Sequence, residues 1–158
     1  MLHKNYIMTR INANIPMVCL SDQLLLNELG EITRILDSVK NRIEKNQSFN
    51  DIPESFRLGT GHMKFFYNKC AFILLRYSRL RTEYLNRHNK QYSPDHFEET
   101  KIRYEFIEAI RPDLCNIWQA TEEENNLIKQ RILERSKTYK KHTYKGDVIN
   151  DWSNFLNI

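Results

Sequence analysis

An apolar stripe with helical spacing, between residues 21 and 45, constrains the fold of this chain more than any other feature. Because an α-helix turns once every 3.6 residues, apolar residues at alternating steps of four and three lie on one face. Ser21 is a good helix N-cap, Asp22 adds an acid in the first turn, and Pro53 lies beyond the expected end. We therefore predict one long amphipathic helix over residues 21–45, with a stripe made of Leu25, Leu29, Ile32, Leu36, Val39 and Ile43.

Three more helices are predicted further along the chain. The second begins after Gly59-Thr60-Gly61 and runs to about residue 88, and the third runs from Ser93-Pro94-Asp95 to Ile110. The fourth opens on a capping box, Thr121-Glu122-Glu123-Glu124, and ends near residue 137. In the last segment we expect only a short helical turn, packed through Trp152, Phe155 and Leu156.

The composition supports a helical protein of one domain. The 158 residues include only four glycines and four prolines, and no clear strand pattern is present. The expected fold is all-α: a compact single domain of about four helices that cross around one core, with irregular connections.

Charge and cysteine content narrow the class of protein. The net charge is +4, yet residues 129–145 carry seven Lys or Arg against one acid, with two tyrosines among them. This segment suits phosphate attraction and base stacking, or it is simply the solvated end of a helix.

Three dispersed cysteines, with no signal peptide and no membrane-spanning run, indicate a soluble cytoplasmic protein with reduced thiols. The spacing of His88, His96 and His142 suggests no metal site.

Two motifs carry a family resemblance. The first is Met8-Thr9-Arg10-Ile11-Asn12, and the second is Leu58-Gly59-Thr60-Gly61-His62-Met63-Lys64-Phe65-Phe66-Tyr67-Asn68-Lys69. In this order they resemble the phage-type pyrimidine-dimer DNA glycosylase (endonuclease V) family. The resemblance is specific over residues 8–69 and looser to about Gly146. It implies an all-α domain over residues 8–146 with glycosylase and abasic-site lyase activity. It further implies a monomer without cofactors, which acts on damaged, kinked double-stranded DNA in the cytoplasm of a bacterial or phage-infected cell. Residues 1–7 and 147–158 are then an N-terminal extension and a C-terminal tail.

The resemblance implies that the α-amino group of Thr9 is the nucleophile. An α-amine has a pKa near 8, so a useful fraction is neutral at cellular pH and can form an imine with a sugar. In the full sequence the nitrogen of Thr9 is an amide. We therefore expect either that translation starts at Met8 or that the preceding residues are removed; otherwise Thr9 is an ordinary residue of an N-terminal arm.

Glu31 matches the catalytic carboxylate of the family, which would stabilise positive charge on the sugar and assist proton transfer. Without the resemblance, the sequence favours a surface glutamate paired with Arg34 at i,i+3. The resemblance further implies DNA contacts by Arg10, Arg34, His62, Lys64, Arg131, Arg135, Tyr139, Tyr144 and Lys145. His62 could instead cap its own helix, and the turn before it could bind a phosphate or simply require glycine dihedrals.

Two departures from the family pattern leave the substrate open. Gly30 stands where the phage enzyme has an arginine, and residues 138–146 contain tyrosines and lysines but no tryptophan. The substrate is then a pyrimidine dimer or another damaged or modified base. A helical DNA-binding protein without catalysis is the remaining alternative.

Overall fold

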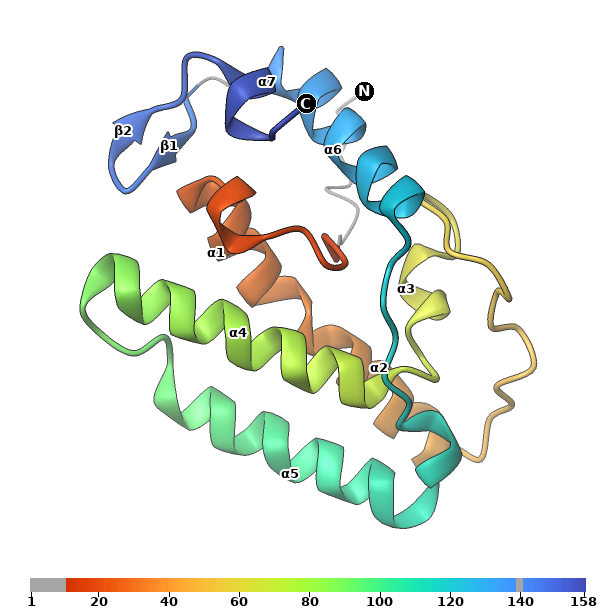
Figure 1. The fold of residues 1–158 in the computed structure, drawn as a ribbon. Coiled ribbons are helices and arrows are strands. Elements are labelled where there is room, and N and C mark those ends of the chain that lie inside the picture. The colour runs from red at the N-terminus through yellow and green to blue at the C-terminus, as the bar shows by residue number, and fades with distance from the viewer. Residues whose placement is uncertain (1–10, 139–140) are drawn as a thin grey trace, which may run out of the picture.

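The computed structural model describes residues 11–138 and 141–158 (Figure 1). Its helices are α1 (Asp22–Glu31), α2 (Thr33–Glu44), α3 (His62–Phe65), α4 (Cys70–His88), α5 (Pro94–Ile110), α6 (Glu122–Ser136) and α7 (Trp152–Phe155), with 3-10 turns η1 (Met17–Cys19) and η2 (Pro112–Leu114). Strands β1 (Thr143–Tyr144) and β2 (Asp147–Val148) pair in an antiparallel hairpin, which is the one sheet in the described part of the chain. The predicted all-α class is confirmed.

The hairpin is a feature that the sequence did not reveal. Lys145 and Gly146 connect its strands with positive φ angles of 52° and 88°. Two consecutive positive φ angles are typical of a type I′ turn, which glycine adopts freely and lysine does not. Strands of two residues are too short for an alternating pattern, so the segment was interpreted only as basic and aromatic.

The prediction of one continuous helix over residues 21–45 is wrong, because α1 and α2 are separated at Ile32. The amide of Ile32 still donates to the carbonyl of Glu28 at 2.9 Å. The next amide along the chain with a backbone acceptor is that of Ile35, which donates to the carbonyl of Ile32 at 3.3 Å. This tighter i→i+3 bond marks a local 3-10 step. The apolar stripe remains buried on both sides of the break, so its periodicity could not show the interruption.

The predicted second helix is also divided, into the single turn α3 and the long α4. Between them, Lys69 forms a β-bridge with Cys115, and the amide of Phe72 donates to the carbonyl of Asn116 at 3.2 Å. A distant segment thus provides hydrogen bonds that helix continuation would otherwise supply. Helices α5 and α6 match their predictions closely, and the capping box at the start of α6 is present.

The core lies between the α1–α2 pair and α4. Helix α1 packs against α4, and α2 packs against both α4 and α5, which run side by side (Figure 1). The stripe residues from Leu25 to Val39 have no exposed surface. The predicted C-terminal turn forms as α7, which contacts α6 and brings Leu156 into the core. Over the described ranges, we find no helix with the length and apolar character needed to cross a membrane.

Candidate active site

The predicted nucleophile Thr9, with Arg10 and Tyr139, lies outside the described residues. The first described residue after Thr9 is Ile11, which lies two positions further along the chain and is buried. Ile11 leads into a turn over residues 12–15, closed by a hydrogen bond of 2.9 Å from the amide of Ile15 to the carbonyl of Asn12. The position of this turn fixes the place from which the N-terminal segment departs.

Asn12 is fastened to α1 by Glu28. Its side-chain amide donates to Oε1 of Glu28 at 2.7 Å, and its backbone amide donates to the same oxygen at 3.3 Å. Arg76 of α4 completes the arrangement, with Nε 2.8 Å from Oε2 of Glu28 and Nη1 2.9 Å from the carbonyl oxygen of Ile15. One buried ion pair thus holds both ends of the turn.

Sequence reasoning missed Glu28 and Arg76, although each carries a detectable signal. Glu28 lies between the buried Leu25 and Ile32 of one apolar stripe, and Arg76 lies beside Tyr77 in the stripe of α4. Charged residues are rarely fully buried unless they are paired. An acid in one stripe and a base in the other therefore predict a buried ion pair between the two helices.

His62 lies inside the domain, with 3% of its surface exposed. Its Nε2 accepts a hydrogen bond of 3.0 Å from the amide of Ile11, and its Nδ1 lies 2.8 Å from the carbonyl oxygen of Arg57. Both ring nitrogens of His62 thus have a hydrogen-bond partner within the protein. A contact of His62 with DNA stays a prediction. The turn before it adopts φ of 87° at Gly61, where a Cβ would lie 3.0 Å from Cδ of Arg57, so glycine is required there.

Glu31 is the last residue of α1, one helical turn beyond Glu28, and its side chain is 22% exposed. Nη1 of Arg34 lies 3.1 Å from its Oε2, so the predicted i,i+3 pair is present. Gly30 is exposed, and a Cβ at this position would meet nothing within 4 Å. The carboxylate of Glu31 is therefore accessible beside an arginine and an open stretch of helix surface.

Lys64 is an exposed residue of α3 that shares the carboxylate of Asp51 with Arg42. Its Nζ lies 2.9 Å from Oδ2 of Asp51, and Nη1 of Arg42 lies 2.7 Å from Oδ1. The hydrogen bonds from Arg42 and Lys64 hold the pKa of Asp51 well below its ordinary value, so this acid is ionised at neutral pH. Lys64 thus contributes less net positive potential than the sequence suggests.

Tyr144 and Lys145 lie in the hairpin, which is attached to the opposite end of α1 from Glu31 (Figure 1). Asp22 accepts hydrogen bonds from the hydroxyl of Thr143 at 2.6 Å and from the amides of Lys145 and Gly146, both at 3.0 Å. Burial acts to raise the pKa of Asp22, but these hydrogen bonds outweigh it and lower that pKa. Neither the hydrogen bonds of Asp22 to the hairpin nor the hairpin itself was predicted from the sequence.

Arg87 adds two further contacts to the attachment of the hairpin. Arg87 of α4 donates to Oδ1 of Asp22 at 3.0 Å, and its guanidinium carbon lies 4.5 Å from the ring centre of Tyr144. The predicted DNA contacts Arg131 and Arg135 lie nearby in the chain, half-buried in the second half of α6. The predicted residues are therefore distributed along α1, α3, α6 and the hairpin rather than in one cleft.

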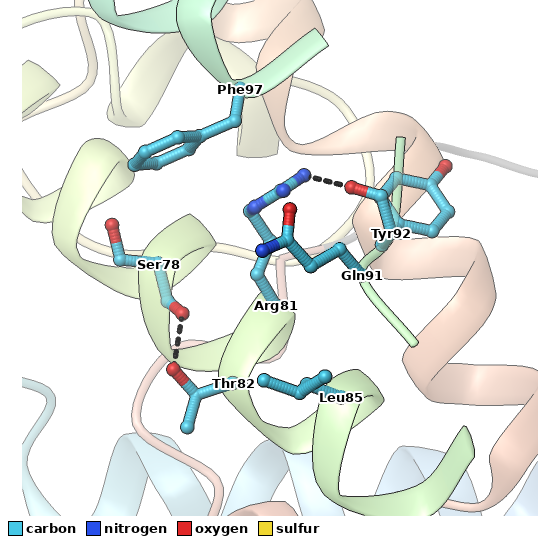
Figure 2. Close-up of a pocket in the computed structure, with 7 residues that line it drawn as sticks. All are labelled: Ser78, Arg81, Thr82, Leu85, Gln91, Tyr92 and Phe97. Carbon is cyan, nitrogen blue, oxygen red and sulfur yellow. Dashed lines mark hydrogen bonds between the residues drawn. The ribbon is translucent and has the colours of Figure 1, made fainter. Parts of the chain in front are cut away.

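A pocket of about 280 Å³ lies between α4 and the start of α5, and none of the predicted site residues lines it (Figure 2). Arg81 points across it, donates to the carbonyl of Tyr92, and lies 4.8 Å from the ring centre of Phe97. The guanidinium of Arg81 is thus bound by other residues of the chain, and the pocket is not part of the site around Glu31.

Glu31 thus presents a partly exposed carboxylate beside one arginine on an all-α domain, and positive charge on such a surface attracts a polyanion such as DNA. A family model described as pyrimidine dimer DNA glycosylase matches residues 8–97, which is more than half of the chain. The chain belongs to this family, as the two sequence motifs indicated. Its activity class is that of a DNA glycosylase.

Proposed function

We propose that this protein removes the damaged base from pyrimidine-dimer DNA and then cleaves the strand through an imine on the α-amino group of Thr9. The amine attacks C1′ of the sugar as the bond from C1′ to the base breaks, and the departing base takes up a proton while the nitrogen loses one. The bond from C1′ to the ring oxygen O4′ then breaks, O4′ takes up a proton, and the electron pair of nitrogen completes the C1′=N bond of the protonated imine. Elimination then removes a proton from C2′ and breaks the bond from C3′ to the phosphate oxygen. Water finally releases the amine from the sugar.

The observation that carries this proposal is the attachment of Asn12 to Glu28, one helical turn from Glu31. Three residues from Thr9 to Asn12 span at most about 10 Å, and one turn of helix rises about 5 Å. The amine of Thr9 is therefore within reach of the Glu31 carboxylate. In that place the carboxylate stabilises positive charge at C1′ and accepts or returns protons during imine formation and elimination.

The proposed substrate is double-stranded DNA, kinked at the lesion and bound by one copy of the protein. Arg10, Arg34, Arg131 and Arg135, with Lys64, Lys145 and the tyrosines 139 and 144, are the proposed contacts. Guanidinium groups suit phosphates because of their paired donors, and aromatic rings suit an extruded base. Extrusion costs a few kcal/mol, and a damaged site lowers this cost.

Borohydride trapping tests the proposal. It uses the chain that begins at Thr9, its N-terminus verified by intact mass, and a duplex with one abasic site. Reduction of the imine should give a covalent protein–DNA adduct through Thr9, and Glu31→Gln should abolish strand cleavage while DNA affinity is retained. Glu44→Gln is the matched control, because Glu44 is also a helical glutamate in a surface ion pair, with Lys40. No adduct and no cleavage by the verified chain would leave only a DNA-binding protein, whereas cleavage unaffected by Glu31→Gln would refute the proposed role of Glu31.

The same chemistry on another modified base is a second candidate, favoured by the open surface at Gly30. A glycine there removes the side chain that would otherwise lie next to Glu31, so a bulkier base has room. Comparison of cleavage rates on duplexes with a dimer, an abasic site or a modified base separates the two. Base removal from dimers alone would eliminate this candidate.

A further inference from the structure

The backbone just after Thr9 is held at two consecutive residues by side chains far away in the sequence. The amide of Ile11 donates to Nε2 of His62, and both donors of Asn12 reach Glu28. Ile11 is 1% exposed and Asn12 is 7% exposed. Chain ends usually fray unless they are tied down, so this double attachment so close to the proposed nucleophile needs an explanation.

The imidazole of His62 is held in one protonation state and one orientation. A carbonyl oxygen can only accept, so the proton lies on Nδ1, which donates to Arg57 at 2.8 Å. Nε2 then carries no proton and accepts from the amide of Ile11. Phe56 and Phe66 pack edge-on against the ring, at centre distances of 5.6 and 5.3 Å. Rotation of the ring would break both hydrogen bonds, so the acceptor for Ile11 is fixed in space.

The turn that follows Ile11 is equally constrained. Ala13 is buried with a φ of 45°, a left-handed conformation that residues with a Cβ rarely adopt. Oδ1 of Asn14 accepts from the amide of Ala120 at 2.6 Å, and the carbonyl of Ile15 accepts from Arg76. The surrounding contacts therefore hold the backbone of residues 11–15 in one strained turn.

We propose that His62 is a positioning residue, which acts through Ile11 to hold the α-amine of Thr9 against Glu31 and the sugar. This inference rests on the proposed function. With Ile11 fixed, only two residues separate the amine from the rigid domain, and each residue has two soft dihedral angles. With the amide of Ile11 released, Asn12 becomes the first attachment and a third residue gains freedom. A misplacement of about 1 Å can reduce a reaction rate about 100-fold.

Two substitutions of His62 separate its two hydrogen bonds. In His62→Gln the amide oxygen extends about as far as Nε2 and can accept from Ile11. In His62→Asn the shorter amide can reach Arg57 but not Ile11. Both variants lose the ring and gain a neutral amide, so each is the control for the other. In the chain that begins at Thr9, at saturating enzyme and in a single turnover, we expect imine trapping with abasic DNA to slow tenfold or more in His62→Asn and much less in His62→Gln. The dissociation constant for DNA should be the same in the two variants, because both lose the imidazole.

Reductive methylation of Thr9 by formaldehyde is a readout that positioning should not change. It requires a free amine but no alignment with Glu31, so we expect equal rates in the wild-type chain and both variants. Absence of trapping in the wild-type chain would refute the proposed function itself. Wild-type trapping that falls equally in both variants, or in neither, would refute only the role of His62.

Amide hydrogen exchange in the full-length wild-type chain provides a test without any substitution. The amide of Ile11 should exchange about as slowly as the core amides of α4, because its bond to His62 is buried. Exchange of this amide at the rate of an unprotected one, while the α4 amides stay protected, would overturn the inference.

Discussion

Arg76 and Glu28 form an ion pair with almost no solvent contact: their charged atoms are 2.8 Å apart, and their side chains are 5% and 0% exposed. One turn further along α1, Glu31 pairs with the exposed Arg34. Two glutamates three residues apart therefore have opposite environments. The inner one holds the turn at Asn12, and the outer one is partly exposed at the surface.

This contrast predicts different effects of the same substitution. Glu28→Gln leaves the guanidinium of Arg76 buried without a counter-charge, so we expect a loss of about 3–5 kcal/mol in the free energy of unfolding. Glu31→Gln should change it by less than about 1 kcal/mol, since surface ion pairs contribute little. Urea denaturation followed by circular dichroism measures both. Equal effects of the two substitutions would contradict the assigned roles.

Arg34→Gln should weaken DNA binding without weakening the fold. Its side chain is 64% exposed, and a phosphate contact by it would release about one counterion. We expect the slope of log K against log salt to fall by about one, with a similar loss for every DNA sequence. Arg111→Gln is the matched control, because Arg111 also forms a surface ion pair, with Asp113. An identical salt slope in both variants would remove Arg34 from the DNA contacts.

Asp22→Asn should detach the hairpin from α1. The carboxylate accepts from Thr143, Lys145, Gly146 and Arg87, and hydrogen bonds to a charged group contribute about 1.5–3 kcal/mol each. We expect faster hydrogen exchange at the amides of Lys145 and Gly146, and weaker DNA binding if Tyr144 and Lys145 contact DNA. The substitution Asp113→Asn, at an exposed acid, should change neither. Unchanged exchange in Asp22→Asn would show that other contacts, such as those of Gln23 with Thr143, hold the hairpin.

Acidification should destabilise the same region through His142. Burial lowers the pKa of this imidazole, which lies 2.8 Å from the hydroxyl of Ser21. Since the unfolded chain then binds a proton more readily, the stabilisation is complete above the ordinary histidine pKa of about 6.5 and is lost as pH falls through the lower folded value. We expect the melting temperature to drop between about pH 7 and 5, and less steeply in His142→Gln.

The exposed His88 is the control for this pH effect, because His88→Gln should leave the slope unchanged. Asp22 adds a separate pH dependence of stability, in a more acidic pH range. Its pKa is lowered, so its contribution is present above about pH 4 and disappears as pH falls further. A single transition below pH 4, with none near pH 6, would exclude His142 as a titrating group of this region.

Local patterns in the sequence predicted the helices with clear end signals. The capping box at Thr121 and the proline at position 94 fixed α6 and α5 because these signals act within one helical turn. The breaks at Ile32 and at residues 66–69 were not predictable in this way. They depend on hydrogen bonds whose partners are chosen by packing, such as that of Phe72 with Asn116.

For the candidate site, the sequence by itself determined the family, the pairing of Glu31 with Arg34, and the expectation that Thr9 is the nucleophile. Those features lie in contiguous motifs or within one turn of helix. Only the tertiary structure decided how the segment at Ile11 and Asn12 is held, because His62, Glu28 and Arg76 are 16 to 65 positions away from those residues in the numbering. Burial removes water as an alternative partner, so these few polar groups must satisfy one another, and that requirement is set by the folded chain as a whole.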